Sequence, residues 1–371
     1  MSNNSNWSIF SILCEVLGGQ NDQRLIQAEM NRQLPALFDI AAVNDVLPAL
    51  AVRCNDQQVS TDTLSEHQRS KLKQALIDNT VRNMQIKAQA LKITTQLNRA
   101  GITPLFLKGT VQLLDPSTKD LGFRKQVDID LLVAPEQLEV AANVFLDTGY
   151  TFYNINAGFS SETTLPLDTP TAIRRSAAHH HLPPLVKEGY ATTVELHRHF
   201  LPKRFQRKNP LEPLFETAHE QQYHGARYLT PALEYQLIHL LLGKMINDGH
   251  LARLTFPVRE ACDYLKVIES GGRNIDQGLI KRHCEEVYPI FSSLVEALMM
   301  HRVKGTSTYP RDLSRRILIM QKRYDFPGIA KLLDTRARLL HLANSLLHNP
   351  AKLPAYVNRI KKTPSSNYLN D

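Results

Sequence analysis

The first 95 residues carry apolar side chains at helical spacing. Within residues 62–100 these side chains recur every three to five positions from Leu72 to Leu97, which places them on one face of a helix. Gly101 follows, at the position where a glycine in the left-handed conformation often ends a helix. The pattern predicts a helical region over residues 1–95.

The period of the apolar positions changes after residue 95. Short apolar runs that suit strands alternate there with helical stripes, and "PEQLEVAANVFLDTGY" has Pro135 in its first turn and Gly149 near its end, as a complete helix does. Residues 96–202 are therefore predicted to form an α/β unit. Its expected strands are "ITPLFLKG" (102–109), "VDIDLLV" (127–133), "TFYNI" (151–155) and "YATTVELHRHF" (190–200), with helices at 110–115 and 135–150.

Helical spacing returns over residues 203–371. In "TPALEYQLIHLLLGKMIND", Thr230 is expected to cap the helix and Pro231 to lie in its first turn. The polar tail "KKTPSSNYLND" is expected to fray. The whole pattern predicts an α+β fold, in which a small mixed β-sheet core is flanked by N-terminal and C-terminal helical regions. Further helices are expected at 258–269, 276–303, 311–322 and 327–348.

Composition indicates a globular chain and argues against several classes of protein. Of the 371 residues, 43% are hydrophobic and 22% are charged, which is ordinary for a soluble protein. The four cysteines lie far apart without a CxxC pair, which argues against a zinc ribbon and a disulfide framework and favours a reducing compartment. No apolar stretch reaches the roughly 18–20 residues that span a bilayer. A secretory signal begins with a positively charged region, but no Lys or Arg precedes the N-terminal apolar run here. We expect a cytoplasmic protein without a membrane partner.

The positive charge of the chain is concentrated near its C-terminus. Residues 301–371 hold 14 Lys and Arg against 4 Asp and Glu, whereas the remaining residues are close to neutral. This distribution is compatible with contact to a polyanion such as RNA. A solvated helical surface would explain the same charges.

Two aspartates interrupt the apolar run "VDIDLLV". The strand period of two places Asp128 and Asp130 on one face and the apolar residues between them on the other. Neighbouring carboxylates repel each other unless a cation lies between them, and oxygen ligands favour Mg²⁺ or Mn²⁺. An edge strand with a wet outer face would give the same pattern.

The surroundings of this run favour a metal and nucleotide site. Upstream, "FLKGT" ends a strand at Gly109 and begins a helix at Thr110, a turn whose backbone amides can bind phosphate, while Lys108 and Arg124 add positive charge. Downstream, Glu195 in "TTVELHRHF" offers a third carboxylate on a further strand. Three such acids can complete a site of the two-metal type.

These residues resemble a known family. "LFLKG", an arginine shortly before "DIDLLV", a helix ending in "TGY" and "VELH" are similar to the bacterial uncharacterised nucleotidyltransferase family, within the DNA polymerase β-like nucleotidyltransferase superfamily. The resemblance covers roughly residues 85–290. It implies that Gly109 and Thr110 stand at the Gly-Ser position, Asp128 and Asp130 at the paired acids, and Glu195 at the isolated acid.

The resemblance implies an enzyme that moves a nucleoside monophosphate from an NTP to an acceptor hydroxyl and releases pyrophosphate. The catalytic and metal-binding residues would be the three acids, with Mg²⁺ or Mn²⁺ as the cofactor, and the nucleotide-binding residues would be Lys108, Gly109, Thr110 and Arg124. The acceptor, whether small molecule, protein or RNA, and the choice of NTP stay open. The alternative is a catalytically silent nucleotide- or RNA-binding protein, or a toxin–antitoxin-type interaction protein, on the same fold.

Two departures from the family pattern and a group of histidines complete the picture. Thr110 adds a methyl group where Gly or Ser is usual, and seventeen residues separate it from Asp128. All three acids are nevertheless present, which favours an active enzyme. The simplest interpretation of the histidines places them on the surface; for His181 and His197, which lie near the third acid, contact with a phosphate or the acceptor pocket is the stronger functional alternative to a zinc cluster. The histidines are His179, His180, His181, His197 and His199.

Overall fold

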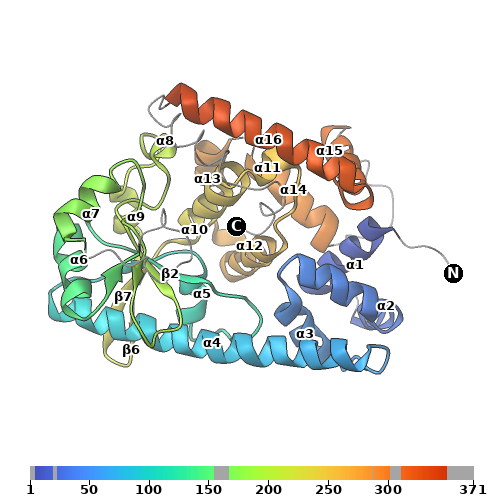
Figure 1. The fold of residues 1–371 in the computed structure, drawn as a ribbon. Coiled ribbons are helices and arrows are strands. Elements are labelled where there is room, and N and C mark those ends of the chain that lie inside the picture. The colour runs from blue at the N-terminus through green and yellow to red at the C-terminus, as the bar shows by residue number, and fades with distance from the viewer. Residues whose placement is uncertain (1–4, 20–22, 154–166, 286, 301–310, 349–371) are drawn as a thin grey trace.

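The computed structural model describes residues 5–19, 23–153, 167–285, 287–300 and 311–348. They form a mostly helical molecule built around one mixed β-sheet (Figure 1). This architecture confirms the predicted α+β class. Among the helices described, none combines the length and the apolar character that crossing a membrane requires.

Helices make up the N-terminal part of the chain, as the apolar spacing predicted. The longest of them, α4, begins with a capping box formed by Ser65 and Gln68, and the chain leaves it through Gly101, which adopts the expected left-handed conformation. Helix α4 extends from α3 to the sheet (Figure 1), so it joins the N-terminal helices to the core. These helices are α1 (Asn6–Gly18), α2 (Gln23–Val43), α3 (Leu47–Asp56) and α4 (Glu66–Arg99).

The described residues contribute seven strands to the sheet, in the order β3-β4-β5-β2-β1-β7-β6. The central strand β2 pairs in parallel with β5 and antiparallel with β1. Helix α5 (Gly109–Leu114) and helix α6 (Leu138–Asp147), the latter behind a short 3-10 turn, lie where the apolar pattern predicted helices. The strands are β1 (Leu105–Phe106), β2 (Asp128–Leu132), β3 (Thr151–Phe152), β4 (Leu185–Val186), β5 (Thr193–His197), β6 (His219–Tyr223) and β7 (Ala226–Thr230).

The β6–β7 hairpin lies beyond residue 202, where the apolar pattern predicted only helices. Strand β7 pairs in parallel with β1, so the sheet continues past that residue. Strand β6 reads "HEQQY" and is largely exposed at the edge of the sheet, so no apolar alternation marks it. Thr230 ends β7 and does not cap a helix, and α10 begins at Leu233. The division of the chain into domains at residues 95 and 202 stays a prediction.

Helices follow the hairpin to the end of the described chain. The predicted helix 276–303 is divided into α13 and α14, because Glu285 takes a positive φ of 40° that ends α13. The tail that was expected to fray lies outside the described residues. Three short helices precede the hairpin, namely α7 (Thr169–Arg175), α8 (Lys203–Gln206) and α9 (Glu212–Glu216). The helices after it are α10 (Leu233–Leu240), the π-helix η3 (Leu241–Asn247), α11 (His250–Arg253), α12 (Val258–Gly271), α13 (Gln277–Cys284), α14 (Val287–Met299), α15 (Arg311–Asp325) and α16 (Pro327–His348).

Two apolar clusters cover the two faces of the sheet. On one face, Ile129 and Leu131 of β2 pack among apolar side chains of α4 and α6. On the other face, Leu132 belongs to the cluster formed by α10, α12 and the N-terminal helices. Because side chains alternate along a strand, Asp128 and Asp130 share the face of Leu132. The acids of β2 therefore point toward the C-terminal helices.

Candidate active site

Strands β2 and β5 bring the predicted acids to one place. In the register of these parallel strands, Asp130 lies directly opposite Glu195, and Leu132 lies opposite His197. Ligand atoms of Asp130, Glu195 and His197 all lie within 4.8 Å of one another. Asp128 lies on the same face, outside this close group but near enough for its charge to be felt by the other two acids.

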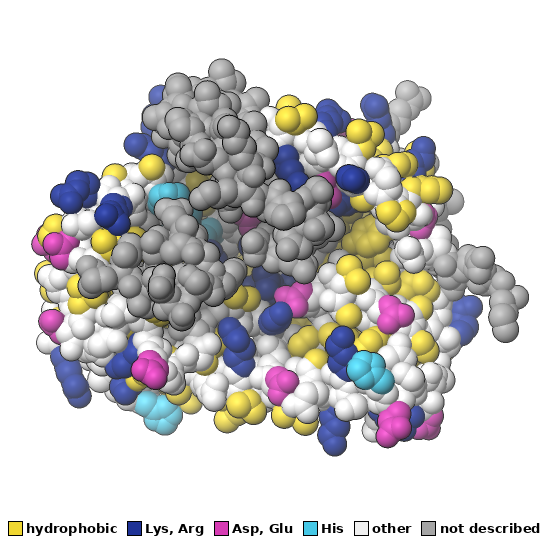
Figure 2. All heavy atoms as spheres, viewed as in Figure 1, with side chains coloured by type: hydrophobic (Ala, Val, Ile, Leu, Met, Phe, Trp, Pro, Cys, Tyr) yellow, Lys and Arg dark blue, Asp and Glu magenta, His cyan; other side chains and the backbone are white. Residues whose placement is uncertain are grey.

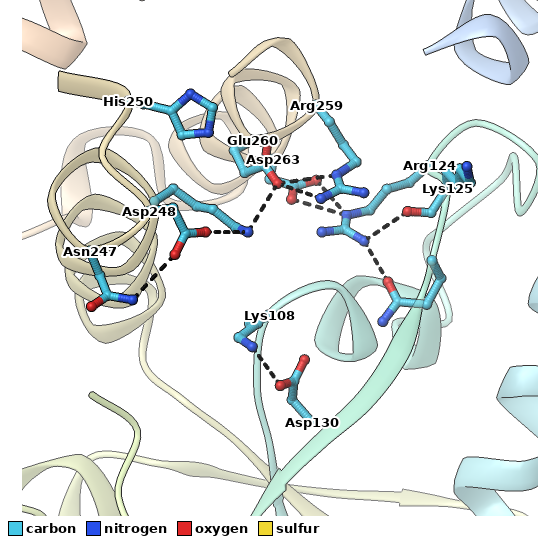
Figure 3. A network of polar contacts seen from close by, with 12 residues as sticks. Lys108, Arg124, Lys125, Asp130, Asn247, Asp248, His250, Arg259, Glu260 and Asp263 are labelled. Atoms are coloured by element: carbon cyan, nitrogen blue, oxygen red, sulfur yellow. Dashed lines mark hydrogen bonds and ion pairs between the residues drawn. The ribbon is translucent and has the colours of Figure 1, made fainter. Parts of the chain in front are cut away.

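Two basic side chains contact the carboxylate of Asp130, which is fully buried. The Lys108 Nζ atom lies 2.6 Å from Asp130 Oδ1 (Figure 3) and 3.9 Å from Glu195 Oε2. The His197 Nε2 atom lies 2.9 Å from the same Asp130 oxygen and 3.4 Å from Glu195 Oε2. The other oxygen of Asp130, Oδ2, is buried and has no hydrogen-bond partner among the described residues. One oxygen atom of this carboxylate is thus left free for a further ligand.

These contacts divide the three carboxylates into two kinds. Burial disfavours the charge of Asp130, but Lys108 and His197 outweigh burial and hold the pKa of Asp130 well below its usual range. For Glu195, burial is likewise outweighed by His197 and Lys108, and its pKa is lowered. For Asp128, burial and the neighbouring Asp130 raise the pKa to about 6. The charge at Asp128 is therefore the least compensated of the three.

The turn at Gly109 is closed by side chains of the segment that precedes β2. A Cβ atom on Gly109 would lie 2.1 Å from both Arg124 Nη1 and Gln126 Oε1. Thr110 is fully buried, and its hydroxyl oxygen accepts a hydrogen bond from Gln126 Nε2 at 3.4 Å. Lys108, just before the turn, adopts a positive φ of 53°, a conformation that costs a non-glycine residue about 1 kcal/mol or more. The Lys108 side chain that leaves this backbone reaches Asp130.

Arg124 links the sheet to the C-terminal helices. Its Nε atom donates to both carboxylate oxygens of Asp263 on α12, at 2.9 and 3.0 Å. Figure 3 shows beside this pair a second one on α12, between Glu260 and Arg259. Glu260 also lies 3.9 Å from Lys244 of the π-helix η3. Nothing in the sequence signals a contact between residues 139 positions apart.

Helix α4 holds the segment that carries Arg124. The Asn79 amide donates to the carbonyl oxygens of Gly122 and Arg124 at 2.6 and 3.1 Å. The Asn83 amide donates to those of Leu121 and Arg124 at 2.5 and 2.7 Å. Both asparagines are buried in the middle of a helix. Their side chains donate hydrogen bonds to the spacer between Thr110 and Asp128 and not to their own helix. The seventeen-residue spacer is therefore an ordered part of the site.

The histidines are not simply surface residues, as the simplest interpretation placed them. His197 is fully buried and His199 is 8% exposed. His181 pairs with His197 in an isolated β-bridge, and the His180 ring lies 5.2 Å from the His197 ring. The signal for His197 was its position two residues after Glu195, which places it on the face of the acids.

Two other features lie away from the acids. A cavity of about 480 Å³ lies between residues 115–120, the β6–β7 hairpin and α12, and none of the three acids lines it. In the basic C-terminal region, Arg316 and Arg323 are paired with Asp312 and Asp334. Figure 2 shows apolar side chains gathered over the α15–α16 pair, and Leu318, Leu332 and Leu339 are among the exposed ones. The predicted polyanion contact of this region stays a prediction.

Comparison with known proteins agrees with this geometry. The model of the family described as uncharacterised nucleotidyltransferase matches residues 31–300, a range that includes all the strands and runs from α2 to α14. Neither the comparison with curated proteins nor the comparison with solved structures found a match. Since the matched range covers most of the chain and holds the paired acids, the protein belongs to the uncharacterised nucleotidyltransferase family.

Proposed function

We propose that this protein is an active, metal-dependent nucleotidyltransferase that moves a nucleoside monophosphate from an NTP to an acceptor hydroxyl. The observation that carries the proposal is the direct pairing of Asp130 with Glu195 on parallel strands, with Asp128 on the same face. Carboxylates gathered in this way repel one another, and a protein that keeps them together has a use for a bound cation.

The residues present fit a divalent ion. Asp130, Glu195 and Asp128 would hold Mg²⁺ or Mn²⁺, and the buried, unpartnered Oδ2 of Asp130 is an oxygen that such an ion would satisfy. A bound ion of this kind neutralises phosphate charge and lowers the pKa of a hydroxyl group near it. The ammonium of Lys108 compensates part of the negative charge at Asp130 Oδ1, which leaves Oδ2 for the ion.

The remaining residues bind and orient the nucleotide in this proposal. Lys108 and Arg124 supply positive charge to the triphosphate, and the turn of Gly109 and Thr110 shapes the space beside it. In the reaction, the acceptor oxygen forms a bond to the α-phosphorus, the bond from that phosphorus to the bridging oxygen breaks, and pyrophosphate carries the electron pair away. The proton of the hydroxyl passes to solvent. The protein contributes positioning and charge compensation, which dominate catalysis of phosphoryl-type transfers.

The test follows the α-phosphate. The purified protein is incubated with each of the four NTPs labelled at the α-phosphate, with Mn²⁺ or Mg²⁺ and a cell extract, and the labelled product is identified by mass analysis. We expect metal-dependent labelling that falls by roughly a hundredfold or more in Asp130→Asn, whereas Asp147→Asn, an exposed acid at the end of α6, retains it. Full transfer by Asp130→Asn would contradict the proposal. Metal-dependent NTP binding without transfer to any acceptor would identify the silent nucleotide-binding protein instead.

A further inference from the structure

Strand β5 delivers an imidazole to the acids as well as a carboxylate. Glu195 and His197 are two positions apart, so both side chains leave the same face of β5 toward Asp130. His197 Nε2 is 2.9 Å from Asp130 Oδ1 and 3.4 Å from Glu195 Oε2. Its side chain is fully buried, so its ring cannot turn away into solvent.

The other nitrogen of His197 decides how this ring can act. Nδ1 lies 3.3 Å from the backbone carbonyl oxygen of His199. A carbonyl oxygen only accepts hydrogen bonds, so a bond there requires the proton on Nδ1. With Nδ1 engaged in this way, Nε2 is directed between Asp130 and Glu195, so it is the ring nitrogen that faces the space where an ion would lie. A histidine that binds a metal typically donates its second ring nitrogen to a carbonyl or carboxylate in this manner.

The second oxygen of Asp130 shows that the polar groups around His197 do not fully satisfy one another. In the described part of the chain, Lys108 reaches Asp130 Oδ1, but Asp130 Oδ2 is left buried without any partner. The carboxylate of Asp130 on β2 and the imidazole on β5 each offer a ligand atom within 4.8 Å of the other, so one ion would contact both. Its ligand atoms would be one nitrogen and carboxylate oxygens from Asp130 and Glu195.

This mixed set of ligand atoms bears on the choice of metal. Mg²⁺ prefers oxygen ligands, whereas imidazole suits first-row transition ions. We propose that His197 Nε2 binds the ion directly, together with Asp130 and Glu195, and that this nitrogen makes the site prefer a divalent transition ion to Mg²⁺. The inference deepens the proposed function. It rests on that function only for the role of the ion in nucleotidyl transfer, not for the binding of the ion.

The rival role for His197 is that of a counter-ion. A doubly protonated ring would donate from Nε2 to Asp130 and would never contact a metal. The two roles differ in a property that binding affinity alone does not report, namely whether a nitrogen nucleus is coupled to the electron spin of the bound ion.

The experiment uses Mn²⁺ as the probe. The full chain is titrated with Mn²⁺ and, separately, with Mg²⁺, for the wild type, for His197→Gln and for the matched control His180→Gln, whose ring neighbours His197. We expect the wild type and His180→Gln to bind Mn²⁺ at least about tenfold more tightly than Mg²⁺. In His197→Gln, Mn²⁺ binding should weaken by roughly 10- to 100-fold, while Mg²⁺ binding changes little.

Electron spin-echo modulation of the bound Mn²⁺ gives the direct readout. We expect coupling to a bound ¹⁴N in the wild type, its replacement by ¹⁵N coupling when the histidines are labelled with ¹⁵N, and its loss in His197→Gln. The labelling arm needs no variant, so it shows whether a histidine binds the ion even if His197→Gln does not fold, and in the described part of the chain His197 is the histidine grouped with the acids. Bound Mn²⁺ without nitrogen coupling would overturn the proposal while leaving the transferase assignment intact. Nitrogen coupling in a protein that neither binds nor transfers nucleotide would preserve the metal site and end the transferase assignment.

Discussion

The substitution Gly109→Ala tests the packing of the turn beside the acids. A Cβ at this position would lie 2.1 Å from Arg124 Nη1 and from Gln126 Oε1, and 2.3 Å from Arg124 Cζ. These atoms are the ends of flexible side chains, so the backbone can stay in place while both side chains move by more than 1 Å. Gln126 is buried and donates to the carbonyl oxygen of Asp128, and Arg124 is held by Asp263. Neither side chain can move without breaking a hydrogen bond.

The cost follows from the bonds that must break. Loss of the charged contact between Arg124 and Asp263 costs roughly 1.5–3 kcal/mol, and crowding of a packed site costs about 1–3 kcal/mol. We expect the free energy of unfolding to fall by about 2.5–6 kcal/mol. With an unfolding entropy of about 2 cal/mol/K per residue over 371 residues, the thermal midpoint should fall by roughly 3–8 °C. Under the proposed role of Arg124 in holding the triphosphate, NTP affinity should fall about tenfold.

The assay combines thermal unfolding with binding of an NTP analogue that cannot be cleaved between the α- and β-phosphates. Gly328→Ala is the matched control, because Gly328 lies in α16 with open space around its Cβ position. That variant should be as stable as the wild type or gain up to about 1 kcal/mol from helix propensity. If Gly109→Ala kept both the thermal midpoint and the nucleotide affinity of the wild type, the packing of Arg124 and Gln126 against the turn would be wrong.

Three further predictions concern charge and support of the site. Lys108→Met should bind Mn²⁺ about tenfold more tightly, because it removes the ammonium 2.6 Å from Asp130, and should bind NTP more weakly; calorimetry showing weaker Mn²⁺ binding would contradict this. Burial and the nearby Arg253 lower the pKa of His250 to about 4, so the stability it contributes is present above about pH 6.5 and is lost as the pH falls toward 4. Urea unfolding should show a loss of about 2 kcal/mol from this group between pH 7 and pH 5, absent in His250→Gln. Asn83→Leu leaves the Leu121 carbonyl without its donor and the Arg124 carbonyl with Asn79 alone, at a cost of about 1–3 kcal/mol, and should speed amide hydrogen exchange over residues 119–126; unchanged exchange would refute the support from α4.

The acids could be predicted because their arrangement follows from local periodicity. Alternation along one strand places Asp128 and Asp130 on one face, and the same alternation places Glu195 and His197 on one face of another strand. Glu195 was expected on a strand next to the aspartate pair, and the register shows it there, directly opposite Asp130. The burial of His197 could not be predicted, because it depends on how α10 packs over the sheet.

The residues that hold the site in place from other parts of the fold could not be predicted from the sequence. Asp263 lies on an amphipathic helix far along the chain, and its pairing with Arg124 depends on the tertiary arrangement alone. Asn83 interrupts the apolar stripe of α4, and a polar residue in such a helix is ordinarily exposed to solvent. The edge strand β6 is stabilised by its backbone pairing with β7, so its polar side chains gave no strand pattern.

The most direct test of the central claim is binding of a non-cleavable NTP analogue with and without a divalent ion, since it needs no knowledge of the acceptor. We predict that the wild type binds the analogue only in the presence of Mn²⁺ or Mg²⁺, and that Asp130→Asn and Glu195→Gln lose this metal-dependent binding while they remain folded. Binding that is indifferent to the metal, or that survives both substitutions, would show that the paired carboxylates of β2 and β5 are not a metal and nucleotide site.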